Sequence, residues 1–452
     1  MKSTIIFGIV LLAVPVVFAE QLVEVKRKPD DKKWKSEPTR LLSDVKDFKS
    51  SEPMHSQYGG RTDRKAKATG FFRVEQQNGR WWLIDPEGCL MLSVGCCAVN
   101  SNPTARGKEA LQKKFGGEKQ WAAQTLDLLT ANGFNTLACW SDAKRLGAAK
   151  PRMAYTPVLN FMSNYGKKRG GTYQKPGHMG YPNDCIFAFD PEFPAFCEKL
   201  AQEQLAPLKN DPWLLGIFSD NEMPFPAAAL DKFLALPAGD AGRKAAERWV
   251  ADHDGKKDNA AFLEHVADSY FRAVSSAIRK AAPNHLYIGC RFHGGDSRRP
   301  ELWRAAGRHV DVVSMNYYGA WTPDAGTMSN WLKSSGKPFM ITEWYAKGVD
   351  SGFANTTGAG WLVKTQKDRG AFYQNYTLGL LEHPGCVGWH WFKYMDNDPT
   401  NKHVDPSNID SNKGIVSNTY EPYPDLLARM KQINRNVYGL ADRLDAHRQK
   451  SE

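Results

Sequence analysis

The chain has 452 residues, 42% hydrophobic and 24% charged, with a formal net charge of +11. This length exceeds one small domain and suits a barrel domain with insertions, which typically takes roughly 250 to over 400 residues. No repeat at a fixed period is visible, which argues against a solenoid or a propeller. The positive charge suits an acidic polysaccharide or generic solubility. Because no nucleic-acid-binding motif accompanies the charge, we expect no nucleic acid as partner.

The N-terminus has the composition of an export signal. Lys2 supplies a positive start, residues 5–18 form an apolar run, and Ala19 is a small residue suited to a cleavage position. The run is shorter than the roughly 20 residues of a membrane-spanning helix, and Pro15 interrupts it. We therefore expect a signal peptide over 1–19, in preference to a membrane anchor. The protein would then be secreted or periplasmic, without a membrane span.

The mature chain divides by composition. Residues 20–69 are charged and poor in apolar periodicity, which predicts an extended, partly disordered lead-in. Two β-prone runs around Asn78-Gly79 then predict a short β-hairpin. We expect residues 70–440 to form the catalytic domain, hairpin included, and 441–452 a tail.

Eight short apolar runs alternate with amphipathic segments in the main domain. Such alternation predicts parallel βα units, and eight units indicate an α/β fold of the (β/α)8 TIM barrel class. An open doubly wound sheet is the alternative, but no glycine-rich dinucleotide fingerprint follows the first run. The runs are 91–99, 135–140, 153–159, 214–219, 286–291, 310–316, 339–342 and 386–391.

The cysteines and acidic residues predict no metal or cofactor. Five of the eight cysteines lie within these apolar runs, which favours free buried thiols, although export would permit disulfides. No spacing resembles a zinc site. Asp396, Asn397 and Asp398 could contact calcium, but three oxygens are too few to predict a site, and a solvated loop is the simpler interpretation.

Two glutamates follow predicted strands at positions that can face one another. Asn221-Glu222 comes after the fourth run and Glu343 after the seventh. Either alone could be a helix N-terminal charge or a solvated residue. In a barrel, however, strand ends converge at one mouth. Glycoside hydrolysis needs two carboxyl groups there, about 5–5.5 Å apart for retention and about 6.5–9.5 Å for inversion.

These motifs resemble those of a known family. An Asn-Glu pair after strand four and a glutamate after strand seven resembles the pattern of the large clan of retaining (β/α)8 glycosidases. Within that clan the chain most resembles the family 50 β-agarases, over roughly 70–438. The stretches that carry the resemblance are 70–88, 216–222, 343–369 and 388–399.

The resemblance implies roles for matching residues. Glu222 would be the acid/base and Glu343 the nucleophile. Asn221 would hydrogen-bond the sugar 2-hydroxyl. Tyr317 would hold the nucleophile through a hydrogen bond, with Tyr318 as the competing assignment.

Other side chains at strand ends are candidates for binding sugar. Trp391 would form the floor under the ring, while Trp389 shares its strand face, so one of the two should lie deeper. The loop 349–360 could close over the substrate or be static. The remaining candidates are His293, Asn316, Trp140 and Lys393, for which a structural histidine and a salt bridge are the alternatives at His293 and Lys393.

We therefore expect a secreted retaining glycoside hydrolase that cleaves β-linked galactans of the agarose type, with a polysaccharide or oligosaccharide as its partner. One rival is an enzyme of the same clan acting on a sulfated galactan such as porphyran or carrageenan, on a β-glucan or on a β-mannan. Others are an inactive polysaccharide-binding barrel and a cell-surface structural protein. The sequence makes no prediction of oligomeric state.

Overall fold

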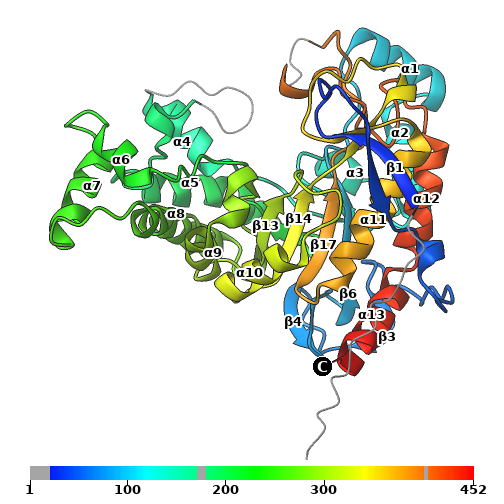
Figure 1. The fold of residues 1–452 in the computed structure, drawn as a ribbon, viewed down its shortest axis with the longest axis horizontal. Helices are drawn as coiled ribbons and strands as arrows, with labels where there is room; N and C mark the ends of the chain where they lie inside the picture. Colours follow the sequence, from blue (N-terminus) through cyan, green and yellow to red (C-terminus); the bar gives the residue numbers. More distant parts are fainter. Residues whose placement is uncertain (1–20, 171–179, 402–405, 452) are drawn as a thin grey trace, which may run out of the picture.

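The computed structural model describes residues 21–170, 180–401 and 406–451, so the expected signal peptide lies outside the described residues. The described chain has a mixed α/β fold in which helices pack around a parallel sheet (Figure 1). None of the described helices is both long enough and apolar enough to cross a membrane.

Nine short parallel strands form the centre of the molecule. Seven of them are hydrogen-bonded in the order β12-β13-β14-β17-β7-β8-β9. Isolated bridges join the chain beside β9 to that beside β10, β10 pairs with β11, and Tyr287 O on β11 accepts from Asp311 N just before β13. The bounds are β7 Ser93–Cys96, β8 Thr136–Leu137, β9 Ala154–Tyr155, β10 Gly216–Ile217, β11 Leu286–Tyr287, β12 Phe292–His293, β13 Val313–Asn316, β14 Phe339–Glu343 and β17 Cys386–Trp391.

Amphipathic helices cover the strands, and α8 (Asn259–Ala281) shows why they form. Phe262, Val266 and Tyr270 recur every four residues on its buried face, and Asp258 caps its N-terminus by accepting from two backbone amides. The other helices are α1 Ala105–Phe115, α2 Glu118–Ala131, α3 Ala143–Gly147, α4 Phe161–Arg169, α5 Phe193–Leu205, α6 Ala229–Leu234, α7 Ala241–Asp252, α9 Pro300–Gly307, α10 Ala325–Ser335, α11 Gln366–Glu382, α12 Pro424–Asn434 and α13 Val437–Ser451.

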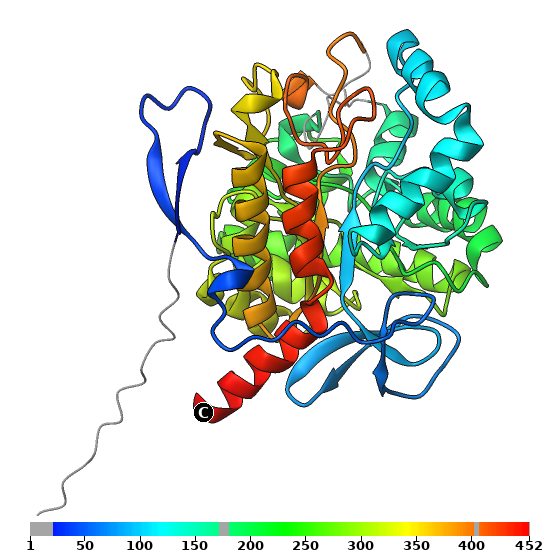
Figure 2. The ribbon, with the colours of Figure 1, turned by 90° about the vertical axis from the view of Figure 1, so that its right-hand side faces the viewer.

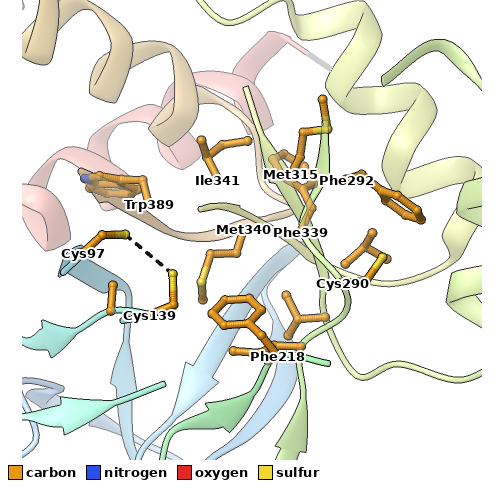
Figure 3. Close-up of a cluster of buried hydrophobic side chains, with 14 of the residues drawn as sticks. Cys97, Cys139, Phe218, Cys290, Phe292, Met315, Phe339, Met340, Ile341 and Trp389 are labelled. Atoms are coloured by element: carbon orange, nitrogen blue, oxygen red, sulfur yellow. Dashed lines mark hydrogen bonds between the residues drawn. The ribbon is translucent and has the colours of Figure 1, made fainter. Parts of the chain in front are cut away.

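Sulfur-containing and aromatic side chains fill the core among the strands (Figure 3). Phe218 and Met340 lie there together with Cys97 and Cys139, whose sulfur atoms are 4.0 Å apart. All eight cysteines are free and buried, which confirms the interpretation of the cysteine pattern as buried thiols.

The segment expected to be a partly disordered lead-in is folded. β1 (Gln21–Lys26) pairs antiparallel with β2 (Lys35–Thr39) and, on its other edge, with β16 (Trp361–Val363). Val23 and Val25 are buried on one face of this ribbon, which projects beside the main domain in Figure 2. Two valines among charged residues are too weak a signal to predict a strand, and the partner on its second edge, β16, lies far along the chain.

An antiparallel sheet packs beneath the parallel strands, and a buried arginine joins it to the last helix. Arg80 is fully buried, donates from Nε and Nη2 to Asp445, and reaches Leu381 O at 2.6 Å. The expected tail is therefore part of α13. The sheet has the order β3-β6-β5-β4, with β3 Arg61–Lys65, β4 Arg73–Gln77, β5 Arg80–Ile84 and β6 Cys89–Met91.

We expect Arg80→Gln to lower the free energy of unfolding by about 3 kcal/mol, because it leaves the mostly buried Asp445 carboxylate with Arg448 as its remaining partner and two backbone carbonyls without their donor. The control Arg73→Gln breaks a partly exposed pair with Glu75 and should cost about 0.5 kcal/mol or less. Denaturant unfolding followed by tryptophan fluorescence measures both. Equal losses in the two variants would contradict the assignment.

Candidate active site

A cavity of about 890 Å³ lies where several parallel strands end. Asn221 and Glu222 come to it from beyond β10, His293 from β12, and Glu343 from the end of β14. Seven of the ten residues singled out from the sequence line it, namely Trp140, Asn221, Glu222, His293, Asn316, Tyr317 and Glu343.

Glu343 is buried and held by two donors. Tyr318 donates its hydroxyl to Oε2 at 2.6 Å, and Arg291 donates from Nη2 to Oε1. Burial raises the pKa of Glu343 to about 7; Arg291 opposes this rise and the charge of Glu222 adds to it. Because a guanidinium does not deprotonate in proteins, Arg291 stabilises the ionised form of this carboxyl.

Arg291 connects three parts of the site. Its Nε donates to Asn221 Oδ1 at 2.7 Å, while Nη2 reaches Glu343. The guanidinium also lies 4.6 Å from the ring centroid of Trp140, in cation–π contact. The arginine therefore fixes the residue beside Glu222 relative to Glu343.

Glu222 occupies a different environment from Glu343. Its side chain is only half-buried, and Asn316 donates from Nδ2 to its Oε1 at 2.8 Å. Asn316 is itself oriented by Thr342, whose hydroxyl donates to Asn316 Oδ1. The backbone of Glu222 has φ of +48°, a left-handed conformation that glutamate rarely adopts and that often marks functional positions.

The tyrosine that donates to Glu343 is Tyr318 and not Tyr317. Tyr317 lines the cavity, but its ring packs edge-on against Trp331 and its carbonyl accepts from Tyr376. Adjacent residues point to opposite sides of an extended chain, so only one of the two can face the carboxylate.

The tryptophans of β17 are not the floor of this cavity. Trp389 and Trp391 are at most 1% exposed and do not line the cavity, and neither does Lys393. Phe392 lines it, with its ring 5.9 Å from that of Trp140 in an edge-to-face contact. Alternation on β17 places both tryptophans on one face, but that face packs against the surrounding core.

Some residues of the site were not predicted from the sequence. Arg291 lies at the end of a predicted apolar run, and an isolated charge in such a run was a usable signal. Arg27 lines the cavity from just beyond β1, and Tyr345 follows Glu343. Nothing local to Arg27 indicated the site, because its position depends on pairing between β1 and β16.

The loop 349–360 is anchored on both sides. Buried Lys347 donates from Nζ to Thr357 O and Gly358 O at 2.8 and 3.1 Å. Asp410 accepts from the backbone amides of Thr356 and Thr357. These contacts favour a static wall over a loop that closes on substrate.

The acidic cluster expected to be a solvated loop is built into the fold. Asp396 accepts from the amides of Lys413 and Gly414 and from the Tyr423 hydroxyl, while Asp398 accepts from Thr104. Among the described residues, no group of three or more His, Cys, Asp or Glu side chains is placed to hold a metal ion.

The cavity therefore combines a buried carboxylate held by a cation with a second, more accessible carboxyl. Such a pair can attack an electrophilic carbon and transfer a proton to a leaving oxygen. Trp140 and Phe392 add apolar ring faces, which suit the C–H faces of a sugar.

Comparisons with known proteins agree with this chemistry. No model of a protein family matches the chain. β-Agarase B of Vibrio sp. (strain JT0107) is 28% identical over 86% of this chain and 51% of its own length. β-Agarase A of the same strain is 28% identical over 84% and 48%. The chain thus spans about half the length of these two relatives.

Two solved structures are also similar. The crystal structure of BpGH50 is 30% identical, with a TM-score of 0.84 over 95% of this chain and 96% of that one. The agarase AgWH50C is 25% identical, with a TM-score of 0.72 over 86% and 67%.

We expect Tyr318→Phe to raise the pKa of Glu343, because the hydroxyl stabilises the ionised carboxylate. Tyr317→Phe, which removes a hydroxyl that does not reach this carboxylate, should leave the pKa unchanged. Infrared difference titration of the carboxyl band, assigned with Glu343→Gln, measures it. A shift of equal size in both variants would show that the two tyrosines are not distinguished in this way.

Proposed function

The chain belongs to glycoside hydrolase family 50, and from this we propose that it cleaves β-linked galactan with retention, using Glu222 as acid/base and Glu343 as nucleophile. Membership makes it a β-agarase-like glycoside hydrolase. The substrate, the mechanism and the catalytic residues are the proposed part. The supporting observation is that both glutamates line one cavity and are linked through Arg291, Asn221 and Asn316.

In the first proposed step, Glu343 attacks the anomeric carbon and Glu222 donates its proton to the glycosidic oxygen. The bond to the leaving sugar breaks, and a glycosyl ester forms on Glu343. In the second step, Glu222 takes a proton from water, which attacks the same carbon and releases Glu343. The two roles suit the two environments, because Glu343 has fixed donors for its negative charge and Glu222 is accessible.

The fold supports a closed (β/α)8 barrel over residues 70–440, extended by a β-hairpin. The strands follow one another in chain order around the sheet, β17 pairs with β7, and bridges and backbone hydrogen bonds carry the order through β10 and β11. The site residues come from the carboxyl ends of strands, where catalytic groups of such barrels lie. We place β17 as the eighth strand, which would close the barrel.

Export through the segment 1–19 belongs to the same proposal. A polysaccharide too large to enter a cell has to be cleaved outside the cytoplasm. The positively charged start, the apolar run and small Ala19 support a cleaved signal peptide.

Replacing either glutamate with glutamine should abolish most hydrolysis. We expect kcat to fall by about 10²- to 10⁴-fold in Glu222→Gln and at least as far in Glu343→Gln, since each removes an essential carboxyl. Reducing-sugar release from agarose measures the rate. NMR of the first product should show the β-anomer, as retention requires.

Glu382→Gln is a matched control, because Glu382 pairs with Arg40 at the surface and does not line the cavity. It should retain wild-type activity. Wild-type protein that binds agarose without cleaving it would instead support an inactive binding barrel. A first product in the α-configuration would refute retention.

The pH dependence of kcat/KM should follow the ionisation of Glu343. Its pKa of about 7 means that the nucleophile loses its charge as pH falls, so kcat/KM should decline below about pH 7. Arg291→Met removes a cation that lowers this pKa, so the acid limb should move to higher pH. Profiles of kcat/KM for the two proteins test this, and a limb that moves to lower pH would contradict the assignment.

A further inference from the structure

The catalytic cavity continues into a second hollow. A cavity of about 550 Å³ lies between α9 and α10 and shares Ser297, Arg298 and Thr327 with the wall of the first. The two hollows adjoin at these residues, and we refer to them together as the cleft. A polymer lying in it would pass Arg298 at the junction.

This extension opens beyond the end of β12. The backbone amide of Glu222 donates to Arg291 O, so the chain beyond β10 runs beside the start of β12. Arg298 ends the short helix η4 (Gly294–Arg298) that follows β12.

The charges along the cleft are one-sided. Apart from the two catalytic glutamates, the formally charged side chains that line it are basic: Arg27, Arg298, Arg304 and Lys333. Among the described residues that line the second hollow there is no aspartate or glutamate. A cleft lined by one sign of charge concentrates ligands of the opposite sign.

Arg304 is paired with Glu264, whereas the guanidinium groups of two of these arginines form no ion pair within the described parts of the chain. Arg298 is exposed and forms no ion pair there. The guanidinium of Arg27 is half-buried, donates to Ala359 O at 2.8 Å and lies over the Trp361 ring, again without an ion pair. Burial lowers the pKa of Arg27, and the nearby Asp31 carboxylate partly opposes this.

We infer that the galactan cleaved by this enzyme carries negatively charged substituents, sulfate esters or carboxylates, which Arg298 recognises at the junction of the two hollows and Arg27 at another wall of the cleft. Arginine suits both groups, because its planar fork donates two parallel hydrogen bonds to their oxygens. A neutral galactan offers no group of opposite charge to either arginine. The inference rests on the proposed galactanase function and names its substrate class.

One polysaccharide in three chemical forms tests the inference. Agarose is used as the neutral polymer, after partial sulfation, and after oxidation of primary hydroxyls to carboxylates. We expect the wild type to have the highest kcat/KM on an anionic form, with a preference that shrinks as ionic strength rises. The form preferred distinguishes sulfate from carboxylate.

Substitutions test which arginines bind the negatively charged groups. Arg298→Gln should lose about tenfold in kcat/KM on the preferred anionic form and less than about twofold on the neutral polymer, while Arg298→Lys keeps part of the activity. Arg27→Gln tests the other wall in the same way. Arg248→Gln changes an exposed arginine on α7 that lines neither cavity, and should change nothing.

Preference for the neutral polymer, or equal losses on neutral and anionic forms in Arg298→Gln and Arg27→Gln, would overturn the inference while leaving the proposed galactanase intact. Hydrolysis of none of the three forms would overturn the proposed function and the inference with it.

Discussion

The buried contact between Arg291 and Glu343 sets the geometry of the whole site. Removing both charges from water is costly, so the contact is stable only if the remaining donors and acceptors are also satisfied. Tyr318 supplies the second donor to Glu343, and Asn221 accepts from the other side of the guanidinium. Residues from beyond β10, β11 and β13 are thereby positioned relative to one carboxylate at the end of β14. Displacing any of these strand ends would leave a buried charge without one of its hydrogen-bond partners.

Two identical carboxyl groups acquire different properties from this arrangement. Two fixed donors hold the Glu343 carboxylate and offset part of the cost of removing its negative charge from water, although burial still raises its pKa to about 7. Glu222 is half-buried and accepts a hydrogen bond from the neutral amide of Asn316, which stabilises an ionised carboxyl less than the charged donor beside Glu343 does. A nucleophile benefits from the first environment and a proton donor from the second. The asymmetry arises from the neighbours and not from the residue type, as expected where one site uses the same group twice.

Sequence reasoning succeeded where the signal was local. Glu222 and Glu343 each follow an apolar run, and strand ends in alternating α/β folds converge, so their proximity could be predicted. Trp391 was assigned to the wrong side, because alternation shows which residues share a face but not which face borders the cavity. Arg291 gave a weak signal, an isolated charge in an apolar run, whose meaning becomes clear only from its contacts with Asn221 and Glu343. Arg27 gave none, since a contact between distant segments leaves no trace in either one.

The attachment of β1 has a consequence for how specificity can change over evolution. Only two residue pairs join β1 to β16, and Val25 holds the register by facing the core. Side chains alternate between the two faces of a strand, so inserting one residue after Val25 would turn Arg27 away from the cleft. The ribbon is separate from the strands that carry the glutamates. Natural variation in this short segment could therefore redirect the enzyme to another polymer while its chemistry stays the same.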